Sequence, residues 1–176
     1  GLPVSCVEMP IHQAATQVTR GQEHIAWLKE HYPLVVNTVV DLTTTFETMV
    51  AALPTDANAE VIELARANTR ARLRMATLYY MAGLHGYLVA GTGNKVEDFG
   101  VGFFTKYGDG GVDLSPIADL TKTEVYELAK ELGILQSIQD AAPTDGLFGD
   151  SRTDADQIGA TYPELKWAME LRASGR

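Results

Sequence analysis

The side chains that best suit nucleotide chemistry lie in one glycine-rich stretch, residues 91–113. This stretch reads GTGNKVEDFGVGFFTKYGDGGVD and follows directly on an apolar run at residues 87–90. Oxygen ligands, ammonium groups and flat apolar faces come from Thr92, Asn94, Glu97, Lys95, Lys106, Phe103, Phe104 and Tyr107. Hard oxygen atoms bind Mg²⁺, and ammonium groups bind phosphate. The combination suits a nucleotide with its metal; the alternative is a surface loop held by an aromatic plug.

A second set of cations lies on a predicted long helix, residues 57–84. Arg66, Arg70 and Arg74 are spaced four apart, so they form one stripe on a helix. Like charges at this spacing destabilise a helix by about 0.2–0.5 kcal/mol per pair unless an anion neutralises them. The stripe is therefore either a solvated basic face or an anion-facing surface, and the spacing leaves both interpretations open.

Apolar periodicity and capping residues predict the elements that hold these side chains. Strands are predicted from the short apolar runs at residues 4–9, 34–40 and 87–90. Helices are predicted at residues 12–30, 44–53, 57–84, 122–132 and 164–172, with a further turn at 134–140 and a polar loop at 143–153. Thr55 or Asp56 is expected to cap the long helix, and Thr121 and Gly133 are expected to begin and end the helix at 122–132.

The alternation of strands and helices predicts an α/β fold, a parallel sheet with helices on both faces. In open sheets of this kind, ligands bind outside the carboxyl ends of the strands. The glycine-rich stretch follows the third predicted strand, so it is expected at that edge. No repeat, low-complexity tract or linker divides the 176 residues, which indicates a single domain.

Composition limits the partners. The formal net charge of −9 argues against bulk binding of nucleic acid or of an anionic membrane, so an anionic substrate would have to meet local cations. Cys6 is the single cysteine, which excludes an internal disulfide and a multi-cysteine metal site. No apolar stretch is long enough to span a bilayer and no secretory signal is visible, so we expect a cytoplasmic protein.

The string GFFTKYGDGG, residues 102–111, is specific enough to indicate a family. Residues 3–167 resemble the NAD synthetase family of the N-type ATP pyrophosphatase superfamily, most strongly between residues 68 and 162. The resemblance implies a Rossmann-like three-layer sandwich of the adenine nucleotide alpha-hydrolase type. It also implies a homodimer that binds deamido-NAD at the subunit interface, with the helix at 57–84 as a candidate for much of that interface.

Three positions match family residues that contact deamido-NAD. These are Arg72 in NTRAR, Lys106 in FFTKYGDGG, and Asp113, which closes that motif. The resemblance thus implies an anion-binding role for an arginine beside the basic stripe.

Four further positions match family residues that contact ATP or the metal. Thr92 in the GT turn, Lys122 in LTKTE and Thr144 in APTDGL would contact ATP, and Glu97 would bind Mg²⁺. We expect Glu97 to share one glycine-hinged pocket with the deamido-NAD residues Lys106 and Asp113.

The resemblance implies a two-step reaction. ATP activates the carboxylate of deamido-NAD as an acyl-adenylate and releases pyrophosphate; ammonia then displaces AMP to form NAD. Both substrates are polyanions, so the site needs Mg²⁺ and fixed cations. The alternatives are another ATP pyrophosphatase that adenylates a different substrate, and a catalytically inactive nucleotide-binding fragment.

Two segments of the family have no counterpart in these residues. The SGGxDS loop, which cradles the ATP phosphates, and a C-terminal His-Lys pair are not found in the sequence. We therefore expect a truncated NAD synthetase domain that is inactive alone. The interval between Glu97 and GFF is also one residue longer than in the commoner family pattern.

Overall fold

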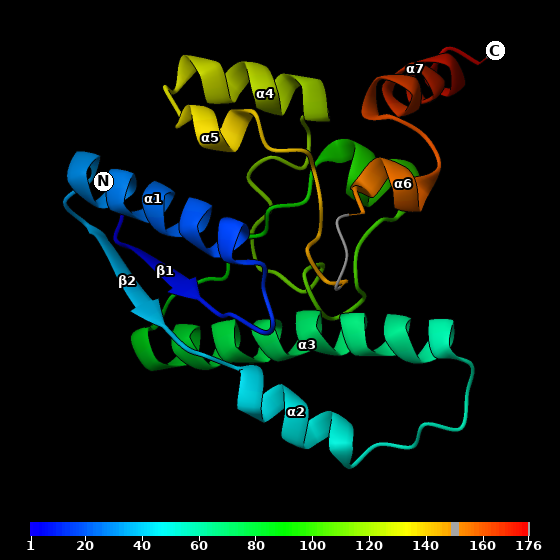
Figure 1. The fold of residues 1–176 in the computed structure, drawn as a ribbon. Helices are drawn as coiled ribbons and strands as arrows, with labels where there is room; N and C mark the ends of the chain where they lie inside the picture. Colours follow the sequence, from blue (N-terminus) through cyan, green and yellow to red (C-terminus); the bar gives the residue numbers. More distant parts are fainter. Residues whose placement is uncertain (149–151, 176) are drawn as a thin grey trace.

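The computed structural model describes residues 1–148 and 152–175. A two-stranded parallel sheet forms its N-terminal part (Figure 1). β1, Val4–Glu8, pairs with β2, Val35–Val39, in a register that places Val4 opposite Val35. α1, Ala15–His31, connects the strands and covers one face of the sheet, and α3, Ala59–His85, crosses the other face (Figure 1). The prediction of a parallel sheet with helices on both faces is confirmed.

The buried core lies where β2 leads into α2, Thr43–Ala51. Phe46 on α2 is 3% exposed and clusters with Ile11 and Leu42. The surrounding apolar side chains are Met9, Val40, Val50 and Leu73. Burying one large apolar side chain contributes about 1.5–3 kcal/mol, so this cluster fixes α2 against α3.

α3 begins at a different residue from the one predicted. Asn58, not Thr55 or Asp56, is its cap, and Asn58 Oδ1 accepts a hydrogen bond from the Val61 amide at 3.0 Å. Gly86 ends the helix in the left-handed region, with φ of 66°, where glycine avoids a steric penalty.

Two arginines of the stripe on α3 donate hydrogen bonds to backbone carbonyls. Arg70 donates to the carbonyl oxygen of Leu147. Arg74 donates to the carbonyl oxygen of Met9 at 3.0 Å and to Gln13 Oε1 at 2.7 Å. These two arginines therefore tie α3 to the segment after β1 and to the loop at 143–148, a role that neither interpretation of the stripe foresaw.

Residues 87–90 do not extend the sheet as predicted. Ala90 pairs with Leu114 in an isolated parallel bridge. A groove of about 430 Å³, lined by side chains such as Val4, Val7 and Leu88, separates this segment from β1. Because the two backbones do not meet across this groove, the segment is extended without joining the β1–β2 ladder.

The C-terminal half is helical. Its elements are η1 (Val96–Val101, a π-helix), α4 (Lys122–Glu131), α5 (Gln136–Gln139), α6 (Asp154–Ile158) and α7 (Tyr162–Ala173). α4 and α5 lie side by side, away from α3 (Figure 1). Thr121 caps α4 as predicted, and Gly133, with φ of 65°, follows its end. No described helix is both long and apolar enough to cross a membrane.

Candidate functional site

The loop at 102–113 lies along one stripe of α3. Thr105 Oγ1 donates to Asn68 Oδ1 at 2.7 Å, and the Thr105 amide donates to Asp109 Oδ1 at 2.9 Å. At Gly108, a Cβ atom would lie 2.8 Å from Thr105 Cγ2 and 2.9 Å from Ala71 Cβ. Such contacts are too short for any side chain, so glycine is what lets the loop approach the helix this closely.

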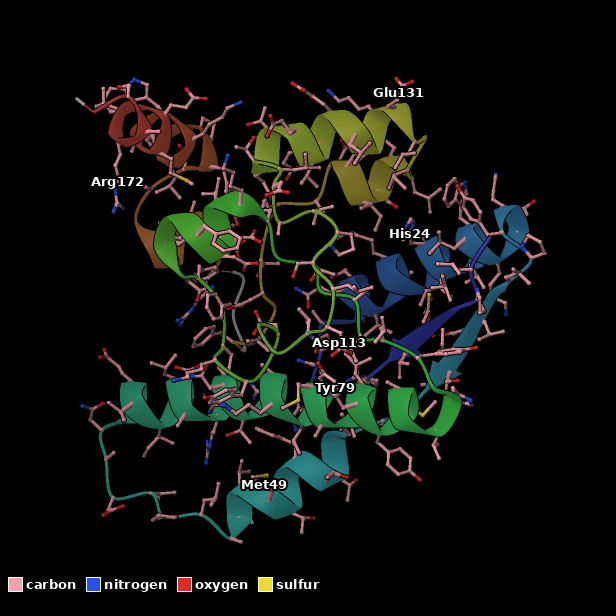
Figure 2. All side chains as sticks on the ribbon, turned by 180° about the vertical axis from the view of Figure 1, so that it is seen from behind. His24, Met49, Tyr79, Asp113, Glu131 and Arg172 are labelled. Atoms are coloured by element: carbon pink, nitrogen blue, oxygen red, sulfur yellow. The ribbon has the colours of Figure 1, made fainter. Side chains whose placement is uncertain are left out.

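The three predicted deamido-NAD residues lie where this loop meets α3. Arg72 Nε donates to the carbonyl oxygen of Lys106 at 3.1 Å, which brings the two cationic residues together. Asp113 lies further along α3, where its Oδ1 accepts from the Tyr79 hydroxyl at 3.0 Å (Figure 2) and its Oδ2 accepts from the Val89 amide at 2.8 Å. Arg72 and Tyr79 are seven residues apart, so they face the loop from the same side of the helix.

An aromatic hollow opens beside this loop. Its volume is about 270 Å³, and it lies between α3, the segment at 102–105 and the segment at 145–148. Phe103, Phe104 and Phe148 line it together with the polar side chains of Asn68 and Asp109. Aromatic faces with a few polar groups suit a flat heteroaromatic ring.

The metal candidate Glu97 is held by a local capping arrangement. Asn94, which is 1% exposed, accepts hydrogen bonds at Oδ1 from the amides of Val96 at 3.0 Å and Glu97 at 3.2 Å. In return, the Asn94 amide donates to Glu97 Oε2 at 3.3 Å. Reciprocal bonds of this kind are those of a capping box, and they begin the η1 helix.

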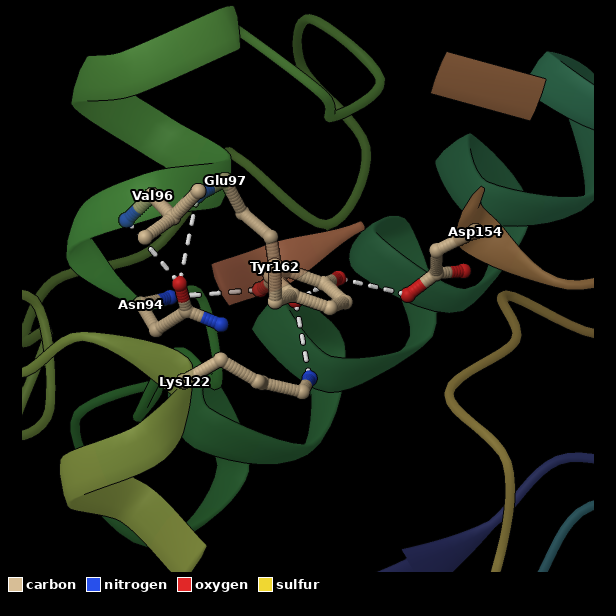
Figure 3. A network of polar contacts seen from close by, with 6 residues as sticks. All are labelled: Asn94, Val96, Glu97, Lys122, Asp154 and Tyr162. Carbon is tan, nitrogen blue, oxygen red and sulfur yellow. Dashed lines mark hydrogen bonds and ion pairs between the residues drawn. The ribbon is translucent and has the colours of Figure 1, made fainter. Parts of the chain in front are cut away.

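Glu97 and the predicted ATP contact Lys122 meet directly. Lys122 Nζ donates to Glu97 Oε1 (Figure 3), and the distance is 2.9 Å. The Lys122 and Glu97 side chains are only 21% and 13% exposed. Lys122 reaches this position because Thr121 begins α4 with a capping box that involves Glu124. The structure therefore brings together the metal candidate and one ATP candidate.

Tyr162 and Asp154 complete the network around Glu97. The Tyr162 hydroxyl lies 2.6 Å from Glu97 Oε1 and 2.7 Å from Asp154 Oδ2 (Figure 3). A phenol has one proton, so it can donate to one of these carboxylates at a time. Asp154 is 5% exposed, and its Oδ1 has no hydrogen-bond partner in the part of the chain that the structure describes.

The network sets different protonation preferences for its members. Burial alone would raise the pKa of Glu97, but hydrogen bonds from Lys122 and Tyr162 outweigh it and hold that pKa below its ordinary value. Burial raises the pKa of Asp154. Burial and the two carboxylates also raise the pKa of Tyr162. Glu97 is therefore ionised and Tyr162 neutral at pH 7.

The Glu97 carboxylate suits a divalent cation as one of several ligands. No three His, Cys, Asp or Glu side chains within residues 1–148 and 152–175 are grouped so that they could hold a metal ion. Mg²⁺ commonly takes only one or two carboxylates and completes its shell with water and substrate phosphate. Glu97 offers hard oxygens that already face a cation, the Lys122 ammonium, so its surroundings accept positive charge.

Among the described residues, no hydrogen bond joins the side chains of the remaining predicted residues, Thr92 and Thr144, to this network. Thr92 is exposed at the glycine turn. Thr144 Oγ1 donates to the carbonyl oxygen of Arg152 at 3.0 Å and accepts from the Gly146 amide at 3.2 Å, so it stabilises a turn.

Glu97, Lys106 and Asp113 do not gather in one pocket as expected. Between the described residues, no hydrogen bond or ion pair joins the Glu97 side chain to Lys106 or Asp113. Glu97 faces Lys122 and α7, whereas Asp113 faces Tyr79 on α3. Glu97 therefore belongs to one cluster, and Lys106 and Asp113 belong to another, although all three lie in the same stretch, residues 91–113.

Sequence reasoning did not identify Asp154 or Tyr162 as site residues. Each lies in the first turn of a helix that opens with a threonine capping box, at Thr153 for α6 and Thr161 for α7. That signal could have placed both residues at helix starts. It could not have shown that they face Glu97, which is 65 residues away from Tyr162 in sequence.

Comparisons with known proteins indicate the family of this chain. The NAD synthase family model matches residues 4–175. An NH(3)-dependent NAD(+) synthetase from Carboxydothermus hydrogenoformans is 48% identical over 127 residues, which are 72% of this chain and 51% of the relative. The chain spans about half the length of the curated relatives it matches.

Two solved structures share the fold. NMN synthetase from Francisella tularensis superposes with a TM-score of 0.86 at 30% identity, over 97% of this chain and 67% of that one. NH3-dependent NAD synthetase from Campylobacter jejuni gives a TM-score of 0.62 at 29% identity, over 77% and 55% of the two chains. Because the family match covers nearly all of its residues, this chain belongs to the NAD synthase family.

Proposed function

We propose that this chain serves the ATP-dependent amidation of deamido-NAD to NAD, with ammonia as the nitrogen donor. The observation that carries the proposal is the contact between Glu97 on η1 and Lys122 on α4. Glu97, the candidate for metal binding, lies in the same glycine-rich stretch as Lys106, a candidate for dinucleotide binding whose carbonyl oxygen accepts from Arg72. The curated relatives named NH(3)-dependent NAD(+) synthetase support the same reaction.

On this proposal, the Glu97 network serves ATP. Glu97 would hold Mg²⁺, which when bound would neutralise charge on the phosphates. Lys122 would then exchange its contact with Glu97 for a phosphate oxygen. It lies in the first turn of α4, where the helix dipole also favours an anion. Thr92 and Thr144 would add hydroxyl contacts to the nucleotide.

The residues where the loop at 102–113 meets α3 would bind deamido-NAD. Arg72 and Lys106 would bind its phosphates, and Asp113 would orient the dinucleotide through its exposed carboxylate. The hollow beside Phe103 and Phe104 is the right size for one ring of the substrate. Once ATP has adenylated the carboxylate and pyrophosphate has left, ammonia attacks the acyl carbon, AMP leaves and the nitrogen loses a proton.

A homodimer in the cytoplasm is part of the same proposal. α3 exposes large apolar side chains along its length, namely Val61 (53%), Leu64 (54%), Tyr80 (67%) and Leu84 (60%). Exposed apolar side chains gathered on one element favour contact with a second copy of the chain.

A second candidate substrate is the mononucleotide. The structural similarity to an NMN synthetase favours it, because that protein shares the fold over 97% of this chain. The two candidates differ in whether an adenosine half must be bound, and the same assay separates them.

The proposal is tested on the protein encoded by the complete reading frame. Deamido-NAD or nicotinate mononucleotide is supplied with ATP, Mg²⁺ and ammonium, and the products are followed by mass spectrometry. We expect equimolar NAD and AMP from deamido-NAD, strong loss of rate in Arg72→Met, and little change in the matched control Arg66→Met, whose side chain is exposed on the same helix. Binding of ATP without any amidated product would establish the nucleotide-binding alternative instead.

A further inference from the structure

The C-terminal helices α6 and α7 supply two side chains to the Glu97 network that the proposed reaction does not use. We propose that Tyr162 and Asp154 are positioning residues, which hold the Glu97 carboxylate in the orientation that receives a divalent cation. The proposal rests on the proposed function, in which Glu97 binds Mg²⁺.

Tyr162 is suited to this task because it holds Glu97 without adding charge. Lys122 also holds the carboxylate, at 2.9 Å, but an ammonium competes with a metal for the same oxygens. When Lys122 turns to a phosphate, the Tyr162 hydroxyl at 2.6 Å still fixes Glu97 Oε1. Its ring also lies against Lys122, with Nζ 4.9 Å from the ring centroid, so the same side chain borders both partners.

Asp154 acts on Tyr162 from the opposite side. Its Oδ2 lies 2.7 Å from the hydroxyl oxygen, so the Asp154 side chain limits how far the phenol can move away from Glu97. Its position is itself fixed, because the Asp154 amide donates to the carbonyl oxygen of Pro143 at 3.0 Å and the side chain is 5% exposed. Among the described residues, Asp154 Oδ1 has no hydrogen-bond partner. A buried oxygen without a partner lowers stability, which favours a role for Asp154 in the site.

A separate packing contact keeps Tyr162 in place. At Gly100 on η1, a Cβ atom would lie 2.7 Å from Met169 Sδ on α7. α7 therefore packs on η1 through Met169, and this contact brings the first turn of α7 to Glu97. This contact does not involve the Tyr162 hydroxyl. Removal of the hydroxyl therefore leaves the packing of α7 on η1 in place.

The test measures Mn²⁺ affinity of the full-length protein by electron paramagnetic resonance of the free ion. The variants are Tyr162→Phe and Asp154→Ala, with Glu97→Gln as the loss-of-site reference. Tyr32→Phe is the matched control, because Tyr32 follows α1 and is 49% exposed. Loss of a partner that orients a metal ligand typically weakens binding about 10–100-fold, so we expect a dissociation constant raised at least about 10-fold in Tyr162→Phe and in Asp154→Ala.

The outcomes separate the two proposals. If Glu97→Gln loses the ion while Tyr162→Phe and Asp154→Ala bind it like the wild type, positioning is refuted and the metal role of Glu97 stands. A lowered melting temperature with unchanged Mn²⁺ affinity also refutes positioning, because that pattern marks a purely structural contact. If Glu97→Gln binds Mn²⁺ like the wild type, both proposals fail. Should Tyr162→Phe not fold, Asp154→Ala decides alone.

Discussion

The ion pair between Glu97 and Lys122 joins η1 to α4, and its removal has a calculable effect on stability. Changing Lys122 to Met keeps an unbranched side chain but removes the ammonium that lies 2.9 Å from Glu97 Oε1. Glu97 would still accept hydrogen bonds from Tyr162 and from the Asn94 amide. It would remain a largely buried carboxylate that has lost its cation.

The loss of unfolding free energy depends on how deeply the ion pair is buried. Removing one partner of a fully buried pair costs about 3–5 kcal/mol, and an exposed pair contributes about 0.2–1 kcal/mol. Side-chain exposures of 13% and 21% place this pair nearer the buried case, while the two remaining donors reduce the loss. We expect Lys122→Met to lower the free energy of unfolding by about 2 kcal/mol, which lowers the melting temperature by about 4–8 °C in a protein of this size class.

A double-mutant cycle isolates the pair. Thermal and urea unfolding are measured for Lys122→Met, Glu97→Gln and the double variant, with the exposed Lys130→Met as the control on the same helix. Because a neutral Gln does not need a cation, the double variant should be more stable than the sum of the single losses predicts, by about 1–2 kcal/mol.

Additive losses would refute this reasoning. They would mean that Lys122 stabilises α4 without acting on Glu97, so that the contact carries no electrostatic coupling. A Lys122→Met variant that melts with the wild type would refute it equally.

Three other expectations concern pH and packing. The pKa of Glu97 is held below its ordinary value in the folded protein. Its contribution to stability is therefore present above the pKa of the unfolded state, about 4.3, and is lost as pH falls through the pKa of the folded state. Melting temperatures should fall more steeply in acid for the wild type than for Glu97→Gln. Burial raises the pKa of Asp154, so the wild type loses stability as pH rises from the unfolded value of about 3.9 through the folded value; Asp154→Asn should remove that loss in scans between about pH 4 and pH 8. Gly108→Ala should destabilise the protein by about 1–3 kcal/mol in urea unfolding, because the new Cβ atom meets Thr105 and Ala71. Gly83→Ala on α3, where a Cβ atom meets nothing within 4 Å, should stabilise it by about 0.4–1 kcal/mol. Equal effects of the two substitutions would contradict the close approach of the loop to α3.

Local signals predicted the helices because their information lies within a few residues. Thr121 and Gly133 mark the ends of the α4 region in sequence, and the structure uses both. The family string at residues 102–111 likewise predicted a loop that matters, since its glycine at 108 is required for contact with α3.

Features that depend on distant partners were not predictable. Residues 87–90 have the composition of a strand, but a strand needs a neighbour, and a groove lies between this segment and β1. Arg70 looked like part of a charged surface, but its guanidinium reaches the carbonyl oxygen of Leu147, 77 residues further along the chain. Periodicity carries no information about such partners.

The start of η1 was missed for a different reason. Asn94 stands three residues before Glu97, which is capping-box spacing, and the structure shows the reciprocal bonds. The glycines around this pair indicated a loop, so the local helix signal was outweighed. The structure shows that the same capping bonds also orient the proposed metal ligand.

The position of the metal tests the proposed role of Glu97 most directly. Anomalous diffraction from crystals of the full-length protein grown with Mn²⁺ and ATP locates the ion. We expect a peak at coordination distance from the Glu97 carboxylate, with Lys122 Nζ turned from Glu97 to an ATP phosphate. A peak elsewhere, with Glu97 still paired to Lys122, would contradict it.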